Sequence, residues 1–187
     1  LAPLLLRLAK WGTADPAGLP WLDQPPEASV AAARRALEGL GALAGGRITP
    51  LGEAIASLPM APDQAAAVLH GAAAGVGEDA ARLVMLLQEH GLGGRGEDLL
   101  QRLARWRGDR APRSSAAAGI ARGWAGQAAK LSGVIGESPA EDAAESLALA
   151  RPDFVARRRD PSGEHWQSAG GRGYILDPAS PLARAEW

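Results

Sequence analysis

The stretch LAGGRITPLGEAIASLP, residues 43–59, does most to decide the fold. Two short apolar pieces flank Gly45-Gly46, a pair typical of a tight turn, and so predict a small hairpin. Thr49-Pro50 then predicts the start of a helix, because threonine caps a helix N-terminus and proline is tolerated at the first helical position. The helix has to end before Pro59. A small hairpin followed directly by a helix is therefore expected here.

The segments on either side predict mostly helices. Residues 2–11 form a short helix, and Pro25-Pro26-Glu27 opens another whose buried stripe is Val30, Ala33, Leu37 and Leu40. Further helices are expected at 63–74, 78–90, 97–107 and about 115–131. Their expected inward residues are Ala66, Leu69 and Ala73; Ala81, Val84, Met85 and Leu87; Leu99, Leu100, Leu103 and Trp106; and Ile120, Trp124, Ala128 and Leu131.

The C-terminal part changes character. Ser138-Pro139-Ala140-Glu141 matches a capping box and predicts a helix from there to about Ala150. Beyond it, Phe154-Val155, Trp166 and Tyr174-Ile175-Leu176 lie among glycine, proline and charged residues, which predicts strands. This segment is too short to close a sheet alone. We therefore expect the chain to be a piece of a longer protein that ends within a β domain.

Length and composition exclude several classes of protein. The chain has 187 residues, 47% of them hydrophobic and 22% charged, so it can bury a core and is not wholly disordered. It has no cysteine, which excludes a disulfide scaffold, a zinc ribbon and a cysteine nucleophile. No targeting segment and no apolar run of membrane-spanning length is present. A soluble, cytoplasmic protein without membrane contact is expected.

The sequence shows no catalytic or cofactor motif. Lys10 and Lys130 are followed by Trp11 and Leu131, so neither belongs to a phosphate-binding loop. The serine-elbow pattern is absent, and the three histidines have no metal-ligand spacing. Paired carboxylates fall in predicted first helical turns, where capping accounts for them. We expect neither an active site nor a metal or cofactor site in this chain.

Charge is distributed unevenly along the sequence. Residues 1–98 carry a net charge of −4 and residues 136–187 carry −3, whereas residues 99–135 hold seven basic side chains against Asp109 alone. Such a basic island is typical of phosphate contact, and five of its arginines are the candidate nucleic-acid-binding residues: Arg102, Arg105, Arg107, Arg110 and Arg113. The alternative is a solvated helix face. Arg157-Arg158-Arg159 form a second cluster, partly balanced by Asp153 and Asp160. Trp106 and Trp124 are interpreted as core residues rather than base-stacking platforms.

Several motifs together resemble the helicase-associated region of DEAH-box helicases. They are Leu19-Pro20-Trp21-Leu22-Asp23-Gln24-Pro25-Pro26, Ala36-Leu37-Glu38-Gly39-Leu40-Gly41-Ala42-Leu43 and the stretch from Ile48 to Pro62. In that family a leucine-aspartate-proline-proline signature leads into a helix ending in leucine-glycine-alanine-leucine, and Gln24 departs from it. The segments Arg151–Arg159 and Leu176–Ala183 resemble the bacterial HrpB-type branch. The likeness is strong over 19–62 and 150–183 and weak between about 92 and 148.

The resemblance implies a mainly α fold in three parts. Residues 1–62 would be a degenerate winged helix, residues 63–135 a ratchet-like helical bundle along the RNA path, and residues 136–187 a helix plus the start of an incomplete OB-like or branch-specific β domain. The RecA-like motor domains that bind ATP and Mg²⁺ would lie upstream of Leu1. No ATP-binding or catalytic residue carries over, because none of those motifs is in this sequence.

Two functions of different classes follow. The first is an accessory region of an ATP-dependent helicase that holds single-stranded RNA, or DNA, against the motor domains of the same chain. Duplex reading is disfavoured, because the expected recognition helix carries only Arg34 and Arg35 with Glu38 nearby. The second is a helical protein–protein interaction module without nucleic-acid binding. A free-standing enzyme is disfavoured by the absence of catalytic groups.

Overall fold

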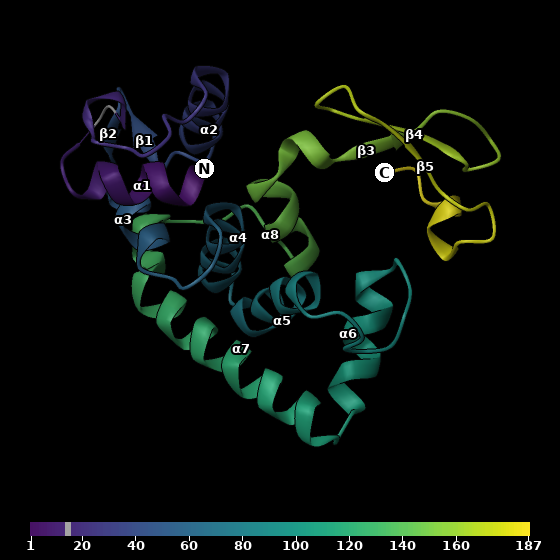
Figure 1. The fold of residues 1–187 in the computed structure, drawn as a ribbon. Helices are drawn as coiled ribbons and strands as arrows, with labels where there is room; N and C mark the ends of the chain where they lie inside the picture. Colours follow the sequence, from purple (N-terminus) through teal and green to yellow (C-terminus); the bar gives the residue numbers. More distant parts are fainter. Residues whose placement is uncertain (14–15) are drawn as a thin grey trace.

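The computed structural model describes residues 1–13 and 16–187; the predicted loop at 12–26 therefore lies partly outside the described residues. Figure 1 shows three groups of elements: an N-terminal group, a central set of helices, and a C-terminal sheet carried on helix α8. Helices dominate, and the two sheets are small and antiparallel. The predicted mainly α fold is confirmed. The domain boundaries after residues 62 and 135 stay predictions.

The N-terminal group packs three helices around a minimal hairpin. Its helices are α1 (Ala2–Lys10), α2 (Glu27–Gly39) and α3 (Pro50–Ala56), and its strands are β1 (Leu43–Ala44) and β2 (Arg47–Ile48), preceded by the 3₁₀ turn η1 (Pro16–Gly18). Gly45 and Gly46 have φ values of 56° and 76°, as a two-residue hairpin turn requires. The Thr49 hydroxyl accepts a hydrogen bond from the Gly52 N–H at 2.9 Å. The predicted hairpin and helix start are confirmed.

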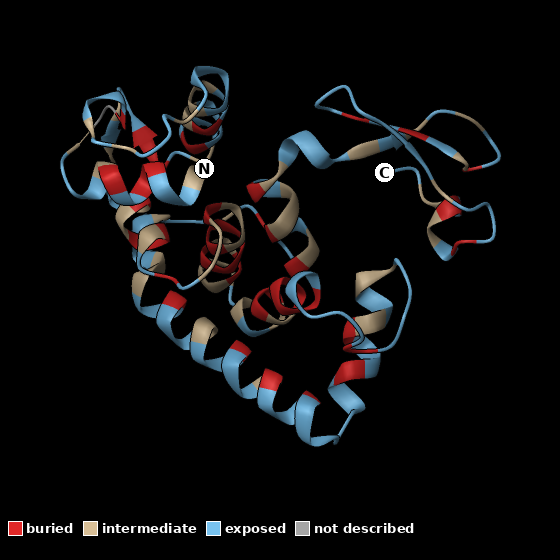
Figure 2. Cartoon of the chain, viewed as in Figure 1, coloured by how far each residue is buried: buried red, intermediate tan, exposed pale blue. Residues whose placement is uncertain are grey.

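The central helices hold most of the core. They are α4 (Pro62–Ala73), α5 (Gly77–Gln88), α6 (Leu99–Gly108) and α7 (Pro112–Leu131), with the 3₁₀ turn η2 (Ser132–Val134) after α7. Buried residues crowd α4 and α5 (Figure 2), including Val68, Leu69 and Val84, each 0% exposed. The long α7 lies across both helices. Its buried residues are Ser114, Ala117, Ala121 and Ala128, small side chains at helical spacing that let it pack closely.

The C-terminal part starts from α8 (Ala143–Ala150), which packs on α4 and α5. A 3₁₀ turn, η3 (Pro152–Phe154), leads into the strands β3 (Ala156–Arg158), β4 (His165–Ser168) and β5 (Gly173–Ile175), and η4 (Pro181–Arg184) follows. The three strands form an antiparallel sheet in the order β3-β4-β5. Strands are thus confirmed here, although Phe154-Val155 precede the first one.

Three residues predicted to face inward are exposed. Leu87 is 47%, Leu100 52% and Ile120 51% exposed. Each helix has a narrower buried stripe than the apolar pattern suggested. Leu86 and Ala121, the neighbours of Leu87 and Ile120, are buried instead, and on α6 the predicted Leu103 and Trp106 are buried without Leu100. Trp106 is buried, and Trp124 packs half-buried against the core, as predicted.

The predicted start of the helix near residue 138 is also wrong. α8 begins at Ala143, because Asp142 Oδ1 accepts hydrogen bonds from the N–H groups of Ala144 and Glu145 at 2.8 and 2.9 Å. The Ser138 hydroxyl instead accepts a local bond from the Ala140 N–H at 3.3 Å. Helix α7 begins three residues earlier than predicted, at Pro112 instead of Ser115, because proline is favoured at the first helical position.

Candidate nucleic-acid interface

Arg102 is committed to internal hydrogen bonds. It is half-buried on α6, and its guanidinium donates to two backbone carbonyls of the preceding segment, Leu92 O at 3.2 Å from Nε and Leu86 O at 3.4 Å from Nη2. These carbonyls lie in the last turn of α5 and in the connection to α6. A cation there satisfies acceptors that the helix itself leaves open. Arg102 therefore fixes how α5 turns into α6.

Two further arginines of the set are paired with carboxylates. Arg107 Nη2 lies 2.5 Å from Asp79 Oδ2 on α5. Arg113 Nη2 lies 3.0 Å from Glu89 Oε2 and donates to the His90 carbonyl at 3.1 Å. Both arginine side chains are more than half exposed, so these pairs are weakly held and can exchange partners.

Arg105 and Arg110 are less engaged. Arg105 is exposed and, among the described residues, donates only to Gln101 O, one turn back in its own helix, at 3.3 Å. Arg110 is exposed in the link between α6 and α7, and within residues 1–13 and 16–187 it forms no ion pair. Its neighbour Asp109 accepts bonds from the Ser114 hydroxyl and the Ala111 N–H, and these bonds lower the pKa of Asp109.

The structure therefore separates the basic island into two groups. Arg102, Arg107 and Arg113 brace α6 and α7 against α5 and the loop that follows it. Among the described residues, Arg105 and Arg110 form no ion pair with α5, although the Arg105 guanidinium lies close to Gly94 in the loop that follows α5. The five do not form one continuous stripe, since Arg102 and Arg105 lie on one side of α6 and Arg107 lies on the other.

Trp106 belongs to the core that these helices share. Its ring is 2% exposed, and its Nε1 donates to Ser114 O at 3.1 Å. The Arg82 guanidinium lies over the ring, 5.4 Å from its centroid, and pairs with Glu78 at 2.8 Å. Such a buried ring cannot stack on a nucleobase, which confirms the interpretation of Trp106 as a core residue.

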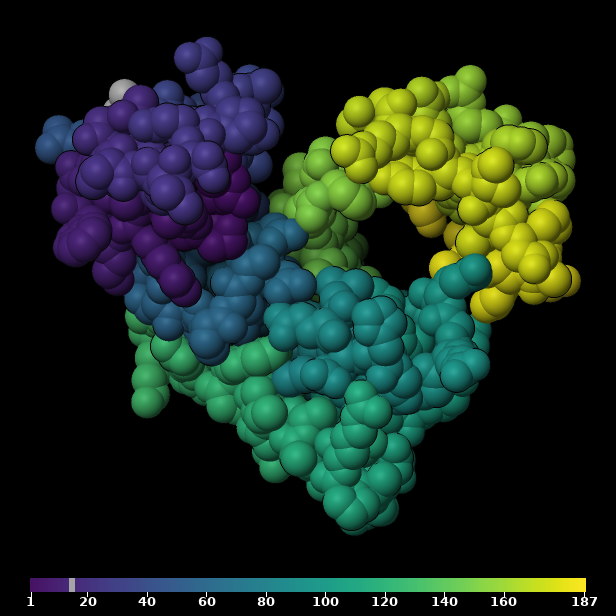
Figure 3. All heavy atoms as spheres, viewed as in Figure 1, coloured from purple at the N-terminus to yellow at the C-terminus, as the bar shows by residue number. Residues whose placement is uncertain are grey.

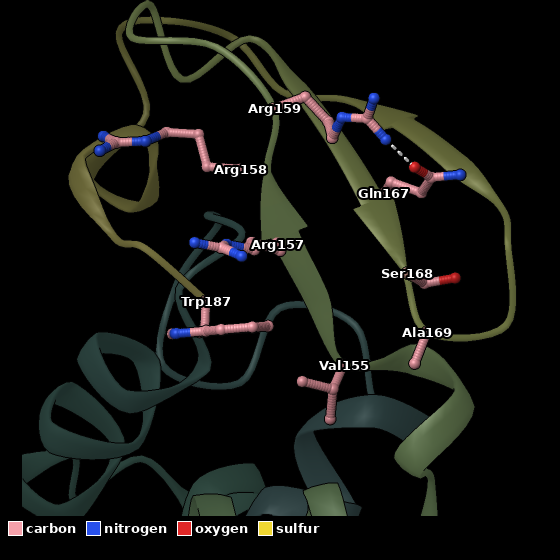
Figure 4. A pocket seen from close by; sticks show the side chains of 8 residues that line it. All are labelled: Val155, Arg157, Arg158, Arg159, Gln167, Ser168, Ala169 and Trp187. Atoms are coloured by element: carbon pink, nitrogen blue, oxygen red, sulfur yellow. Dashed lines mark hydrogen bonds between the residues drawn. The ribbon is translucent and has the colours of Figure 1, made fainter.

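A concave surface lies on the C-terminal sheet, separate from the α6 and α7 arginines. A pocket of about 530 Å³ is lined by Val155, Arg157, Arg158, Arg159, Gln167, Ser168, Ala169 and Trp187. Figure 4 shows Arg157 beside the Trp187 ring, whose centroid is 5.0 Å from the guanidinium carbon, and Arg159 reaching Gln167. The candidate set did not include these residues. The signal that could have found them is the two-residue repeat of a strand, which brings Arg157 and Arg159 to one face.

An apolar groove of about 440 Å³ separates this sheet from the helices. Its apolar lining is Leu87 of α5, Leu147 and Ala148 of α8, and Phe154 and Val155 at the entry to β3; Asp63, Gln64 and Arg151 line it too. The space-filling view shows the molecule hollowed between the yellow C-terminal segment and the green and teal helices (Figure 3). The groove explains why Leu87 and Phe154 are exposed although both are strongly apolar.

The described residues hold no cluster that could ligate a metal ion and no helix long and apolar enough to cross a membrane. His70 is half-buried on α4, with Nδ1 3.4 Å from the Ser138 hydroxyl, and burial lowers its pKa. His165 Nδ1 lies 2.9 Å from Asp160. Each histidine is thus held by a contact with a neighbouring side chain.

Comparison with known proteins shows which proteins this chain is similar to. No family model matches the chain. It is 35% identical, over its whole length, to the ATP-dependent RNA helicase HrpB of Escherichia coli, and it spans 22% of that protein. Two crystal structures of E. coli HrpB, one described as a DExH-box NTPase and the other as a DEAH/RHA helicase, match the whole chain with TM-scores of 0.74 and 0.75. Their sequence identities are 32% and 33%, and the chain covers 22% of each.

These matches agree with the motifs in the sequence. The resemblance predicted from residues 19–62 and 150–183 extends in the comparison through the weak middle segment, since sequence and fold match from end to end. The chain is therefore similar over its full length to the C-terminal region of an HrpB-type helicase, of which it spans 22%.

Proposed function

We propose that the chain is an accessory nucleic-acid-binding region of an ATP-dependent helicase. In this proposal it holds single-stranded RNA, or DNA, against RecA-like motor domains of the same protein, and ATP and Mg²⁺ are bound by those motor domains. The observation that carries the proposal is the full-length match to part of a protein named an ATP-dependent RNA helicase. Such a protein would work in the cytoplasm.

The proposed contacts are Arg102, Arg105, Arg107, Arg110 and Arg113. Arg105 and Arg110 are the first of these to test, because in the part of the chain that the structure describes their guanidinium groups bind no other helix. Arg107 and Arg113 can exchange an exposed carboxylate for a phosphate, whereas Arg102 would have to give up two carbonyl bonds. Contacts of this kind recognise the backbone and are largely independent of sequence.

The test measures how salt changes the affinity of the chain for fluorescein-labelled oligouridylate. If about four to six phosphates are contacted, log affinity falls with log salt at a slope of about −3 to −4. Arg105→Ala/Arg110→Ala should weaken binding and make the slope less steep by about 1.4. Both changes should be the same for every base composition. The matched control, Arg7→Ala/Arg35→Ala, removes the same charge from exposed sites on α1 and α2.

The interaction-module alternative is favoured by one observation, the apolar groove beside Leu87, Phe154 and Val155. That surface suits an apolar segment of a partner protein rather than phosphate. Absence of RNA binding at low salt, or a flat salt response, would contradict the helicase-accessory proposal for the isolated chain and favour this alternative.

A further inference from the structure

One face of the C-terminal sheet is open and cationic. The register pairs Arg157 with Gln167 and Arg158 with Trp166. Because side chains alternate along a strand, Arg157, Arg159 and Gln167 share one face. All three are exposed, whereas Trp166 and Ser168 on the other face are buried. Arg158 also lies on that other face, and its Nη1 donates to Ala183 O at 3.3 Å.

Two contacts set the shape of this open face. Arg159 Nη1 donates to Gln167 Oε1, so the Gln167 amide orients the guanidinium across the strands (Figure 4). Because Gln167 accepts through its oxygen, the N–H groups of its amide can still donate to a ligand. Arg157 lies against the Trp187 ring, which supports the flat guanidinium from one side. With Cα atoms about 7 Å apart along the strand, the two arginines present two donor forks at neighbouring positions, one beside Trp187 and the other beside Gln167 (Figure 4).

Acidic groups do not cancel this charge. Between Val155 and Leu176 the chain has four arginines and two carboxylates, Asp160 and Glu164. Asp160 already accepts bonds from Ser162 and from the backbone and ring of His165. Glu186 is 3.6 Å from Arg157, but both side chains are about two-thirds exposed, so this pair is weak and readily displaced by a phosphate.

We propose that Arg157 and Arg159, with Gln167 between them, form a phosphodiester-binding surface for single-stranded nucleic acid. This inference rests on the proposed function and adds a site that is separate from the α6–α7 arginines. The difference between the two regions lies in their internal bonds. Arg102 is tied to two carbonyls, while the forks of Arg157 and Arg159 are held by an exposed carboxylate, a ring and an amide. A phosphate can approach the sheet face without breaking the fold.

The experiment compares Arg157→Ala/Arg159→Ala with the wild-type chain in the same oligouridylate titration. We expect about tenfold weaker binding at 0.1 M salt and a slope reduced by about 1.4, the loss of two phosphate contacts on a single strand. Arg157→Lys/Arg159→Lys should recover part of the affinity, because it keeps the charges but loses the forks. Oligothymidylate should respond to each variant in the same proportion, since phosphodiester chemistry is common to RNA and DNA.

Controls separate the failure of this inference from that of the proposed function. Suppose that the wild-type chain binds and that neither Arg157→Ala/Arg159→Ala nor Arg7→Ala/Arg35→Ala changes its affinity. This result overturns the sheet-face site and leaves the proposed function standing. Absence of salt-dependent binding by the wild-type chain overturns both. The part of the near-ultraviolet circular dichroism that Trp166→Phe removes is the contribution of the buried Trp166, one of six tryptophans, and that part reports whether the sheet has folded. If the alanine variant loses that signal, the lysine variant decides. It keeps both charges and therefore the salt slope, so an affinity identical to wild type in this variant would count against guanidinium-fork recognition.

Discussion

Gly52 is the residue at which the N-terminal group tolerates least change. A Cβ there would lie 2.1 Å from the Ala42 carbonyl oxygen and 2.8 Å from the Ile48 side chain. The first helical turn of α3 packs directly on the hairpin, and only glycine fits between them. Gly52→Ala should therefore destabilise the chain by about 1–3 kcal/mol, measured as a lower urea midpoint.

Gly123 provides the opposite case. It lies within α7, and an added Cβ would have nothing within 4 Å. Gly123→Ala should raise stability by about 0.5–1 kcal/mol, because it reduces the freedom of the unfolded chain without a clash. Equal effects of the two substitutions would show that helix propensity alone, rather than the contact with Ala42, governs Gly52.

Among the elements, α6 depends on one capping residue. Asp98 Oδ1 accepts hydrogen bonds from the N–H groups of Leu100 and Gln101 at 2.9 and 3.0 Å. Asp98→Ala should cost about 1 kcal/mol of unfolding free energy, whereas Glu97→Ala next to it should change stability by less than about 0.5 kcal/mol. A cost at Glu97 as large as that at Asp98 would assign the effect to charge near the helix N-terminus rather than to the cap.

The same elements show what sequence alone could predict. Gly45-Gly46 and Thr49-Pro50 act through contacts within a few residues, so the hairpin and the start of α3 were predictable. The exposure of Leu87 and Phe154 was not, because it depends on a groove between α5, α8 and the sheet. The two hydrogen bonds that hold Arg102 were not predictable either, because their carbonyl acceptors lie 10 and 16 residues away in the sequence. Net charge located a basic region, but side-chain partners decide which of its arginines are available.

At the scale of the whole molecule, the C-terminal sheet is joined to the helices through α8 and η3. Arg151 sits at this junction. Its Nη1 lies 2.8 Å from Asp63 Oδ2 on α4, 88 residues away, and its Nε lies 3.4 Å from Asp153 Oδ1. The guanidinium also stacks on Phe154, 3.6 Å from the ring centroid. One side chain thus ties α4, the end of α8 and the entry to the sheet together.

Arg151→Ala should loosen the orientation of the sheet more than it lowers stability. The Asp63 pair is partly exposed, so its loss costs about 0–1 kcal/mol, but the same side chain also pairs with Asp153 and stacks on Phe154, where η3 leaves α8. Because the chain has no cysteine, spin labels can be attached at Ala129→Cys on α7 and Ala179→Cys beyond β5 without background. The distance distribution between these labels should broaden in Arg151→Ala and in Asp63→Asn, which breaks the same pair from its other side. It should stay narrow in Arg184→Ala, which removes an exposed arginine from η4. An unchanged distribution in Arg151→Ala would mean that packing between α8 and α4, rather than this ion pair, holds the sheet in place.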